Sequence, residues 1–217
     1  MRRLVSAVAV AALALGFIAT AAGTSSAAGG LAPLPRQYIQ WAFGDAGAPL
    51  LDADLCGEVV NGVFFMTVAG GAPTSVTRRI DCEIPSGVPV LATTGGFIAW
   101  APTDGRTDRQ LSQAVFDALE NLRINSVHLR LDGQEISHGT LRVSDPYDLP
   151  LEPGNLIQTV DPSVVGDSTR VMYGWYFKRL APLPPGDHVL IATDRFDFTA
   201  DGGEVARYRT VFTIHVS

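Results

Sequence analysis

The sequence has few of the residues that carry metal and cofactor chemistry. Its 217 residues include only two cysteines and four histidines. It contains no P-loop, no glycine-rich dinucleotide-binding motif and no His-Glu-x-x-His pattern. We therefore expect no cofactor and no metal site, and no motif assigns a catalytic role to any residue.

Basic residues are also scarce, and two of them belong to a predicted secretory signal. Arg2 and Arg3 precede an apolar stretch at residues 4–22, and small residues follow up to Ala28. Cleavage of residues 1–28 would leave 14 basic and 22 acidic residues, a net charge of −8. This balance disfavours nucleic acid and anionic membranes as partners. A retained membrane anchor is the alternative, but the stretch is only weakly hydrophobic. We expect a secreted, extracellular protein without stable membrane insertion.

Each cysteine lies next to a strand-like run: residues 58–68 follow Cys56, and residues 75–81 precede Cys82. A turn-rich break at residues 69–73 separates the runs, so a hairpin there would place the cysteines opposite each other. Facing Cα atoms on paired strands lie about 4.5–5.5 Å apart, which suits a disulfide. An oxidising compartment would preserve that bond. We predict a disulfide, with two free thiols or a metal pair as alternatives.

The mature chain alternates short strand-like segments with glycine- and proline-rich turns. The pattern predicts a mainly β protein, a two-sheet β-sandwich of immunoglobulin-like or jelly-roll-like type, over residues 36–217 after a flexible lead-in at residues 29–35. One helix is expected at residues 108–122, where an apolar stripe would pack it on the sheet surface rather than on a partner. The expected strands are residues 37–43, 59–68, 75–81, 88–91, 96–100, 126–131, 134 onward, 156–160, 170–180, 188–193 and 208–216.

Asp132-Gly133 predicts a two-residue hairpin turn. In that register Arg130 faces Glu135, and His128 and His138 point to opposite faces, so the two histidines do not share a metal. The proline-rich residues 145–169 form a long connection. Such a connection is either a functional loop or the sign of an unrecognised element.

Several residue groups could carry chemistry, although each has a plainer interpretation. Acidic residues around Gly202-Gly203 could bind calcium or form a glycosidase pair, but acids beside glycines are usual in solvated turns. Gly166-Asp167-Ser168 is similar to a serine-hydrolase motif, but a strand rather than a helix follows it. An aromatic row on one strand face could stack sugars, although core packing against the facing sheet is favoured. The acidic group is Asp194, Asp197, Asp201 and Glu204, and a second acidic pair is Asp52 and Asp54. The aromatic row is Tyr173, Trp175 and Phe177.

Motifs spread over most of the mature chain resemble a family of uncharacterised secreted bacterial proteins. The first set is Cys56, Gly62-Val63-Phe64-Phe65, Arg79, Cys82 and Ile84-Pro85-Ser86-Gly87. Similar stretches follow at residues 132–133, 142–146 and 182–188. The resemblance implies an exported β-rich domain with a disulfide-bridged hairpin, and it implies no activity.

Two classes of function remain. The favoured one is a secreted, non-catalytic module that binds an unknown extracellular ligand, namely a cell-surface component, polysaccharide or protein, through its loops. The alternative is a secreted hydrolase that acts on a polymer through acidic side chains in a cleft.

Overall fold

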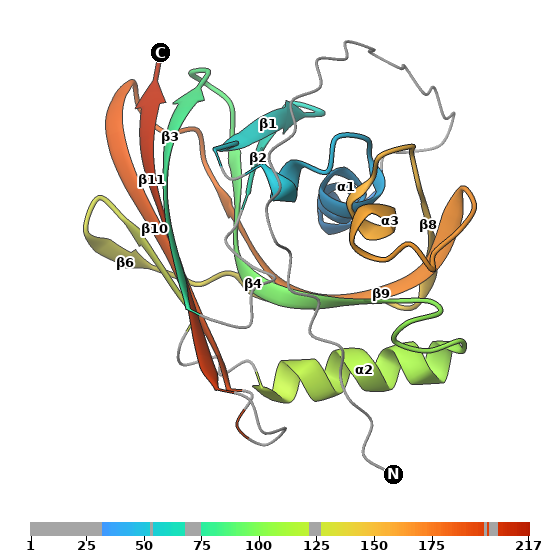
Figure 1. Cartoon of the computed structure of the whole chain (residues 1–217). Helices are drawn as coiled ribbons and strands as arrows, with labels where there is room; N and C mark the ends of the chain where they lie inside the picture. Colours follow the sequence, from blue (N-terminus) through green and yellow to red (C-terminus); the bar gives the residue numbers. More distant parts are fainter. Residues whose placement is uncertain (1–31, 53, 68–74, 122–126, 198, 200–203) are drawn as a thin grey trace.

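A computed structural model describes residues 32–52, 54–67, 75–121, 127–197, 199 and 204–217 (Figure 1). The predicted signal at residues 1–28, the break at residues 69–73 and Asp201 lie outside the described residues. No helix in the described part is long and apolar enough to cross a membrane.

The fold is mainly β and consists of two sheets, as the sequence predicts. Sheet A has the order β1-β2-β4-β9-β7, with β8 also paired to β9, and sheet B has the order β3-β11-β10-β5-β6. The strands of sheet A are β1 Gly57–Val60, β2 Val63–Met66, β4 Val90–Trp100, β7 Thr140–Val143, β8 Tyr147–Pro150 and β9 Ser168–Leu180. Those of sheet B are β3 Val76–Ile84, β5 His128–Leu131, β6 Gln134–Ile136, β10 Gly186–Asp197 and β11 Val205–Val216.

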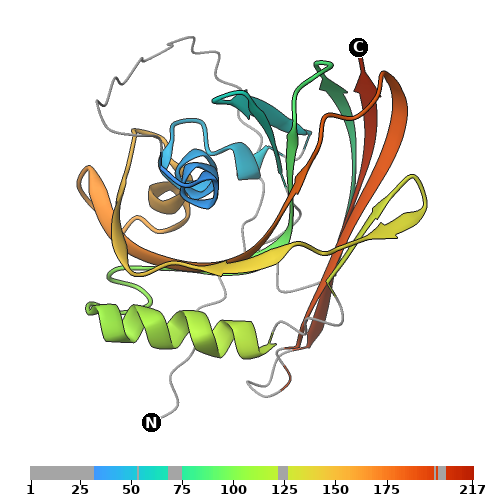
Figure 2. The same ribbon diagram turned by 180° about the vertical axis from the view of Figure 1, so that it is seen from behind.

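The core between the sheets comes from alternate residues of their strands. Leu190, Phe212 and Ile214 of sheet B are at most 1% exposed and pack with Phe64 and Val90 of sheet A. Because side chains alternate across a strand, the residues between these positions face outward. The two inner faces therefore form the sandwich core. The chain passes from sheet B to sheet A between β6 and β7 (Figure 2).

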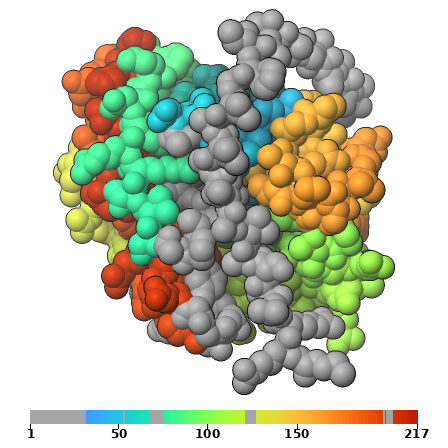
Figure 3. Space-filling view, viewed as in Figure 1, coloured from blue at the N-terminus to red at the C-terminus, as the bar shows by residue number. Residues whose placement is uncertain are grey.

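Short helices cover the second face of sheet A, which the sequence did not reveal. They are α1 Leu34–Ile39, the π-helix η1 Gln40–Gly44, the 3-10 helix η2 Pro49–Leu51 and α3 Leu156–Val160. α1 and α3 lie within the curve of the β4–β9 sheet (Figure 1), and α3 lies across the molecule from β3 (Figure 3). The row of Tyr173, Trp175 and Phe177 is core, but it packs against these helices instead of the facing sheet.

Two predicted strands are thus wrong. Residues 37–43 are helical, and Tyr38, Ile39, Ala42 and Phe43 are buried with helical spacing rather than alternately. Residues 156–160 form α3, whose N-cap Asn155 accepts a hydrogen bond from the Gln158 N–H.

The remaining elements fall near their predicted places. Helix α2 spans Asp108–Asn121 and packs on β4 and β9 through buried Leu111 and Val115. The strands predicted at residues 88–91 and 96–100 form one strand, β4, with an irregularity between Thr93 and Gly95. The long connection at residues 145–169 contains the unrecognised strand β8 as well as α3.

The disulfide between Cys56 and Cys82 is present, with the two Cα atoms 5.4 Å apart. The hairpin predicted to carry it is wrong. Residues 57–66 form the β1–β2 hairpin, which turns at Asn61-Gly62, where both φ angles are positive. Cys82 lies in β3 of sheet B, whereas Cys56 immediately precedes β1 of sheet A. The bond therefore joins the two sheets of the sandwich.

Candidate functional site

The outer face of sheet B collects basic side chains from four strands. Three adjacent rows cross the strands in register. The first contains Arg79 and Arg130 with two apolar residues between them, and the second contains Arg209 and His128 with threonines beside them. The third pairs Arg195 with Arg207. We call this surface the arginine face: Arg79, His128, Arg130, Arg195, Arg207 and Arg209.

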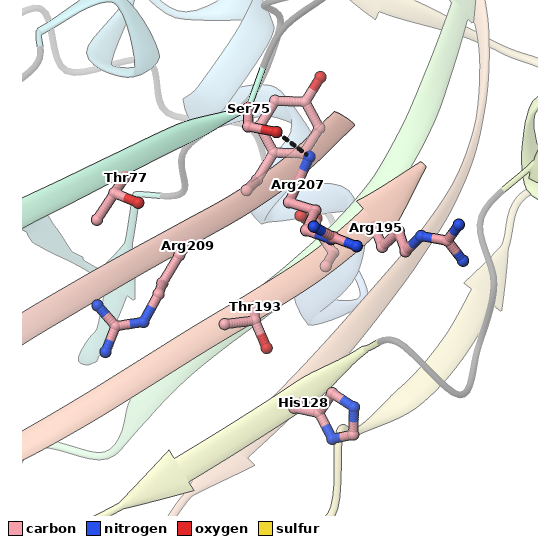
Figure 4. A pocket seen from close by; sticks show the side chains of 9 residues that line it. Ser75, Thr77, His128, Thr193, Arg195, Arg207 and Arg209 are labelled. Carbon is pink, nitrogen blue, oxygen red and sulfur yellow. Dashed lines mark hydrogen bonds between the residues drawn. The ribbon is translucent and has the colours of Figure 1, made fainter. Parts of the chain in front are cut away.

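The face contains a shallow hollow of about 540 Å³. The labelled side chains of Figure 4 come from β3, β5, β10 and β11 and from Ser75, which precedes β3. Hydroxyl groups of Ser75, Thr77 and Thr193 line it together with the arginines. The Ser75 hydroxyl accepts a hydrogen bond from the Arg207 backbone N–H at 3.1 Å. The hollow thus offers guanidinium and hydroxyl donors to a ligand.

Only part of the positive charge is neutralised within the described structure. Glu135 binds Arg130 at 3.1 Å and His128 at 2.6 Å, and these contacts lower the Glu135 pKa, the histidine contact most. Asp197 lies 3.5 Å from Arg195. Arg79, Arg207 and Arg209 form no ion pair with any described residue.

The geometry around Arg195 concentrates like charge. Arg195 lies directly opposite Arg207 on the neighbouring strand, and like charges in that position are destabilising. The Arg195 Nε atom is buried and has no hydrogen-bond partner among the described residues. A buried donor without a partner also costs free energy, so an anion in the hollow would relieve both costs.

The opposite end of the same sheet face is acidic. His215 lies between Glu83 and Asp187 in register, and its Nδ1 atom is 2.8 Å from an Asp187 oxygen. The contact with Asp187 raises the His215 pKa. Asp81 lies one row further along. The outer face of sheet B is therefore dipolar, and an anion is directed to the end that carries the arginines.

The described members of the predicted acidic cluster, Asp194, Asp197 and Glu204, do not form a metal site. Asp194 points to the inner face and is 6% exposed, whereas Asp197 points outward to Arg195. Glu204 is exposed, and no group of described residues has the arrangement of a metal site. Asp52 accepts hydrogen bonds from the backbone N–H groups of Asp54 and Leu55, as in an ordinary turn. A carboxylate pair for hydrolysis gains no support from these positions.

Asp194 is instead a buried carboxyl group inside the sandwich. Its Oδ1 atom has no hydrogen-bond partner within the described structure. A Cβ atom on Gly95 of β4 would lie 2.1 Å from its other oxygen, so glycine at position 95 makes room for this side chain. Burial raises the Asp194 pKa to about 8.

The other candidate residues have structural surroundings. Ser168 begins β9 and pairs with Pro150, and the Asp167 carbonyl accepts a hydrogen bond from the Leu151 N–H. The β5–β6 register is confirmed: Arg130 faces Glu135, and His138 lies apart from His128, against the Tyr176 ring.

Sequence reasoning missed the arginine face. Arg207 and Arg209 occupy alternate positions of one strand and thus share a face, a signal that could have been read. Arg195 pairs with Arg207 across the consecutive strands β10 and β11, whereas Arg79 is distant in sequence and joins them only through the pairing of β3 with β11.

No family model and no curated protein matches the chain. Among solved structures, the protein is similar to a chain in the structure described as "Structure of PbICP-C in complex with falcipain-2". The sequence identity is 10% and the TM-score is 0.28. The match covers 70% of this chain and 98% of the other. The function is therefore inferred from the chain's own residues.

Proposed function

We propose that the protein is a secreted, non-catalytic β-sandwich module that binds an acidic polysaccharide through the arginine face. We also propose that it belongs to the secreted bacterial family that its cysteine and Pro-Ser-Gly motifs resemble. The signal-like N-terminus and the disulfide between the sheets support an extracellular location, because such bonds persist in oxidising compartments.

One observation carries the proposal: Arg195 and Arg207 are directly opposed in a protein whose net charge is negative. Arginines held together at a cost to stability indicate a surface selected for an anion. Guanidinium groups bind carboxylates and related oxyanions in two-point contacts, which suits a polymer with repeated acidic groups.

The lining favours a polysaccharide over a protein segment or nucleic acid. Hydroxyl groups stand between the arginines, and sugar hydroxyls can bond with them. None of the large exposed apolar side chains of the described residues lies in the three arginine rows, whereas the core of a protein interface is usually apolar. The three rows contain no Phe, Tyr or Trp on which single-stranded bases could stack, and Tyr208, which also lines the hollow, is only 7% exposed.

The test measures binding of the purified exported form to immobilised polygalacturonate, with neutral dextran, polyglutamate and duplex DNA in parallel. We expect binding to polygalacturonate only, weakening as salt increases. The double variant R207E/R209E should lose about 10-fold or more in affinity. The matched variant R106E/R109E, which reverses two exposed charges near the start of α2, should bind like the wild type.

Equal loss in the two variants would contradict a specific role for the arginine face. Binding to polyglutamate in preference to the polyuronate would instead indicate an acidic protein partner and overturn the polysaccharide proposal.

A further inference from the structure

A second hollow, of about 410 Å³, lies between the start of α1 and strand β7, away from sheet B. We call it the α1–β7 hollow. Its polar lining is Arg36, Arg142, Ser144, Asp145 and Tyr173, and its apolar lining is Pro33, Pro35 and Val143. Of these residues only Tyr173 belongs to a candidate site in the sequence, the aromatic row that could stack sugars, and the arginine face contains none of them.

Arg36 and Arg142 line this hollow together with the Tyr173 side chain. Burial raises the Tyr173 pKa, and the charges of Arg36 and Arg142 oppose part of this rise. Tyr173 is 4% exposed, and its hydroxyl makes no hydrogen bond with any described residue. Arg36 lies over the Tyr147 ring at 4.5 Å, which fixes its guanidinium without neutralising it. Neither arginine forms an ion pair within the described part of the chain.

The backbone beside the phenol is held firmly. The Ser144 N–H donates to the Tyr173 carbonyl at 3.0 Å, and the Ser144 hydroxyl accepts from the Tyr173 N–H at 3.1 Å. Adjacent Asp145 is exposed and brings a carboxylate to the same hollow. The site therefore places two cations, a free phenolic donor and one acceptor around a partly apolar floor.

We propose that the α1–β7 hollow binds a hexuronate unit, a six-membered sugar ring that carries one carboxylate. Arg36, Arg142 and the Tyr173 hydroxyl are the donors for the carboxylate. Asp145 accepts hydrogen bonds from sugar hydroxyls, and the prolines contact the apolar side of the ring. The Asp145 charge would repel doubly charged phosphate more strongly than a carboxylate, so a uronate is favoured over a phosphate. This site does not depend on the arginine face.

The test titrates glucuronate into the purified exported form and follows binding by NMR, with glucose and inorganic phosphate as parallel probes. We expect glucuronate to bind, glucose to show no binding, and phosphate to bind more weakly than glucuronate. R142Q should weaken glucuronate binding about 10-fold, equivalent to about 1.4 kcal/mol, because the charged donor to the carboxylate is lost. Y173F, which keeps the ring and removes the donor, should weaken it several-fold.

Two control variants separate this proposal from that of the arginine face. R179Q removes an exposed arginine elsewhere on β9, and R207E/R209E alters only the arginine face, so both should bind glucuronate like the wild type. Unchanged binding in R142Q and Y173F, equal binding of glucose, stronger binding of phosphate, or no binding of glucuronate would each overturn the proposal. Loss of glucuronate binding in R207E/R209E would place the uronate on the other surface.

Discussion

Replacing Asp194 with asparagine should stabilise the protein at neutral pH. The side chain lies on the inner face of sheet B, 6% exposed, with one oxygen lacking a hydrogen-bond partner in the described structure. Charge is costly there, so the folded protein keeps the carboxyl protonated until its pKa of about 8. In the unfolded chain the same group loses its proton near the ordinary value of 3.8.

The magnitude follows from these two values. Below about pH 4 both states hold the proton, and between about pH 4 and pH 8 only the folded state does. The free energy of unfolding of the wild type therefore falls as pH rises through this window and levels off above it. Each pKa unit corresponds to about 1.4 kcal/mol, so the loss at pH 7 is about 4 kcal/mol. The amide of D194N does not titrate, and the variant should avoid this loss.

The assay is urea unfolding of wild type and D194N at intervals from pH 4 to pH 9. The two proteins should have similar stability near pH 4, and D194N should gain about 4 kcal/mol over the wild type at pH 7. D117N, at an exposed position of α2, controls for removing one acidic charge. A difference between wild type and D194N that stays constant with pH would refute the reasoning, because it would mean that the buried carboxyl does not retain its proton.

Two further predictions concern the disulfide between the sheets and the packing of α2 on sheet A. Replacing both Cys56 and Cys82 with alanine should lower the free energy of unfolding by about 3.5 kcal/mol, because the bond closes a loop with a sequence separation of 26. A loss below about 1 kcal/mol in urea unfolding would contradict the loop-entropy explanation. G174V should lower the thermal midpoint and cost about 1–3 kcal/mol, because a Cβ atom at Gly174 would lie 2.6 Å from the Leu119 side chain of α2. Unchanged thermal melting of G174V would show that α2 can move away from the sheet without cost.

Local patterns predicted the elements whose partners are close in sequence. The Asp132-Gly133 turn sets the register of β5 and β6, and the apolar stripe of α2 identifies its buried side. The disulfide was predicted correctly, but for the wrong geometric reason. The Asn61-Gly62 turn was overlooked inside an apolar run, so a hairpin was placed one element too late.

The errors arose where burial on both sides hid the periodicity. Residues 37–43 are buried on most sides, so apolar residues occur on more than one face of the helix and resemble the alternation of a strand. Pro33 and Pro35 at the start of α1 nevertheless favour a helix. The arginine face depends on the parallel pairing of β3 with β11, which joins residues 132 positions apart, as in the contact of Ser75 with Arg207. This pairing depends on how the whole sandwich packs, and a local sequence pattern does not predict it.

The place of β11 in sheet B has a consequence for the order of folding. This strand, residues 205–216, lies between β3 and β10; it pairs with β10 along its whole length and with β3 over residues 208–216. The five-stranded sheet consequently stays incomplete until those late residues join it, however much of the chain has already emerged. Folding of the sandwich can therefore be completed only after residues 205–216 are available, even if every other strand has already formed.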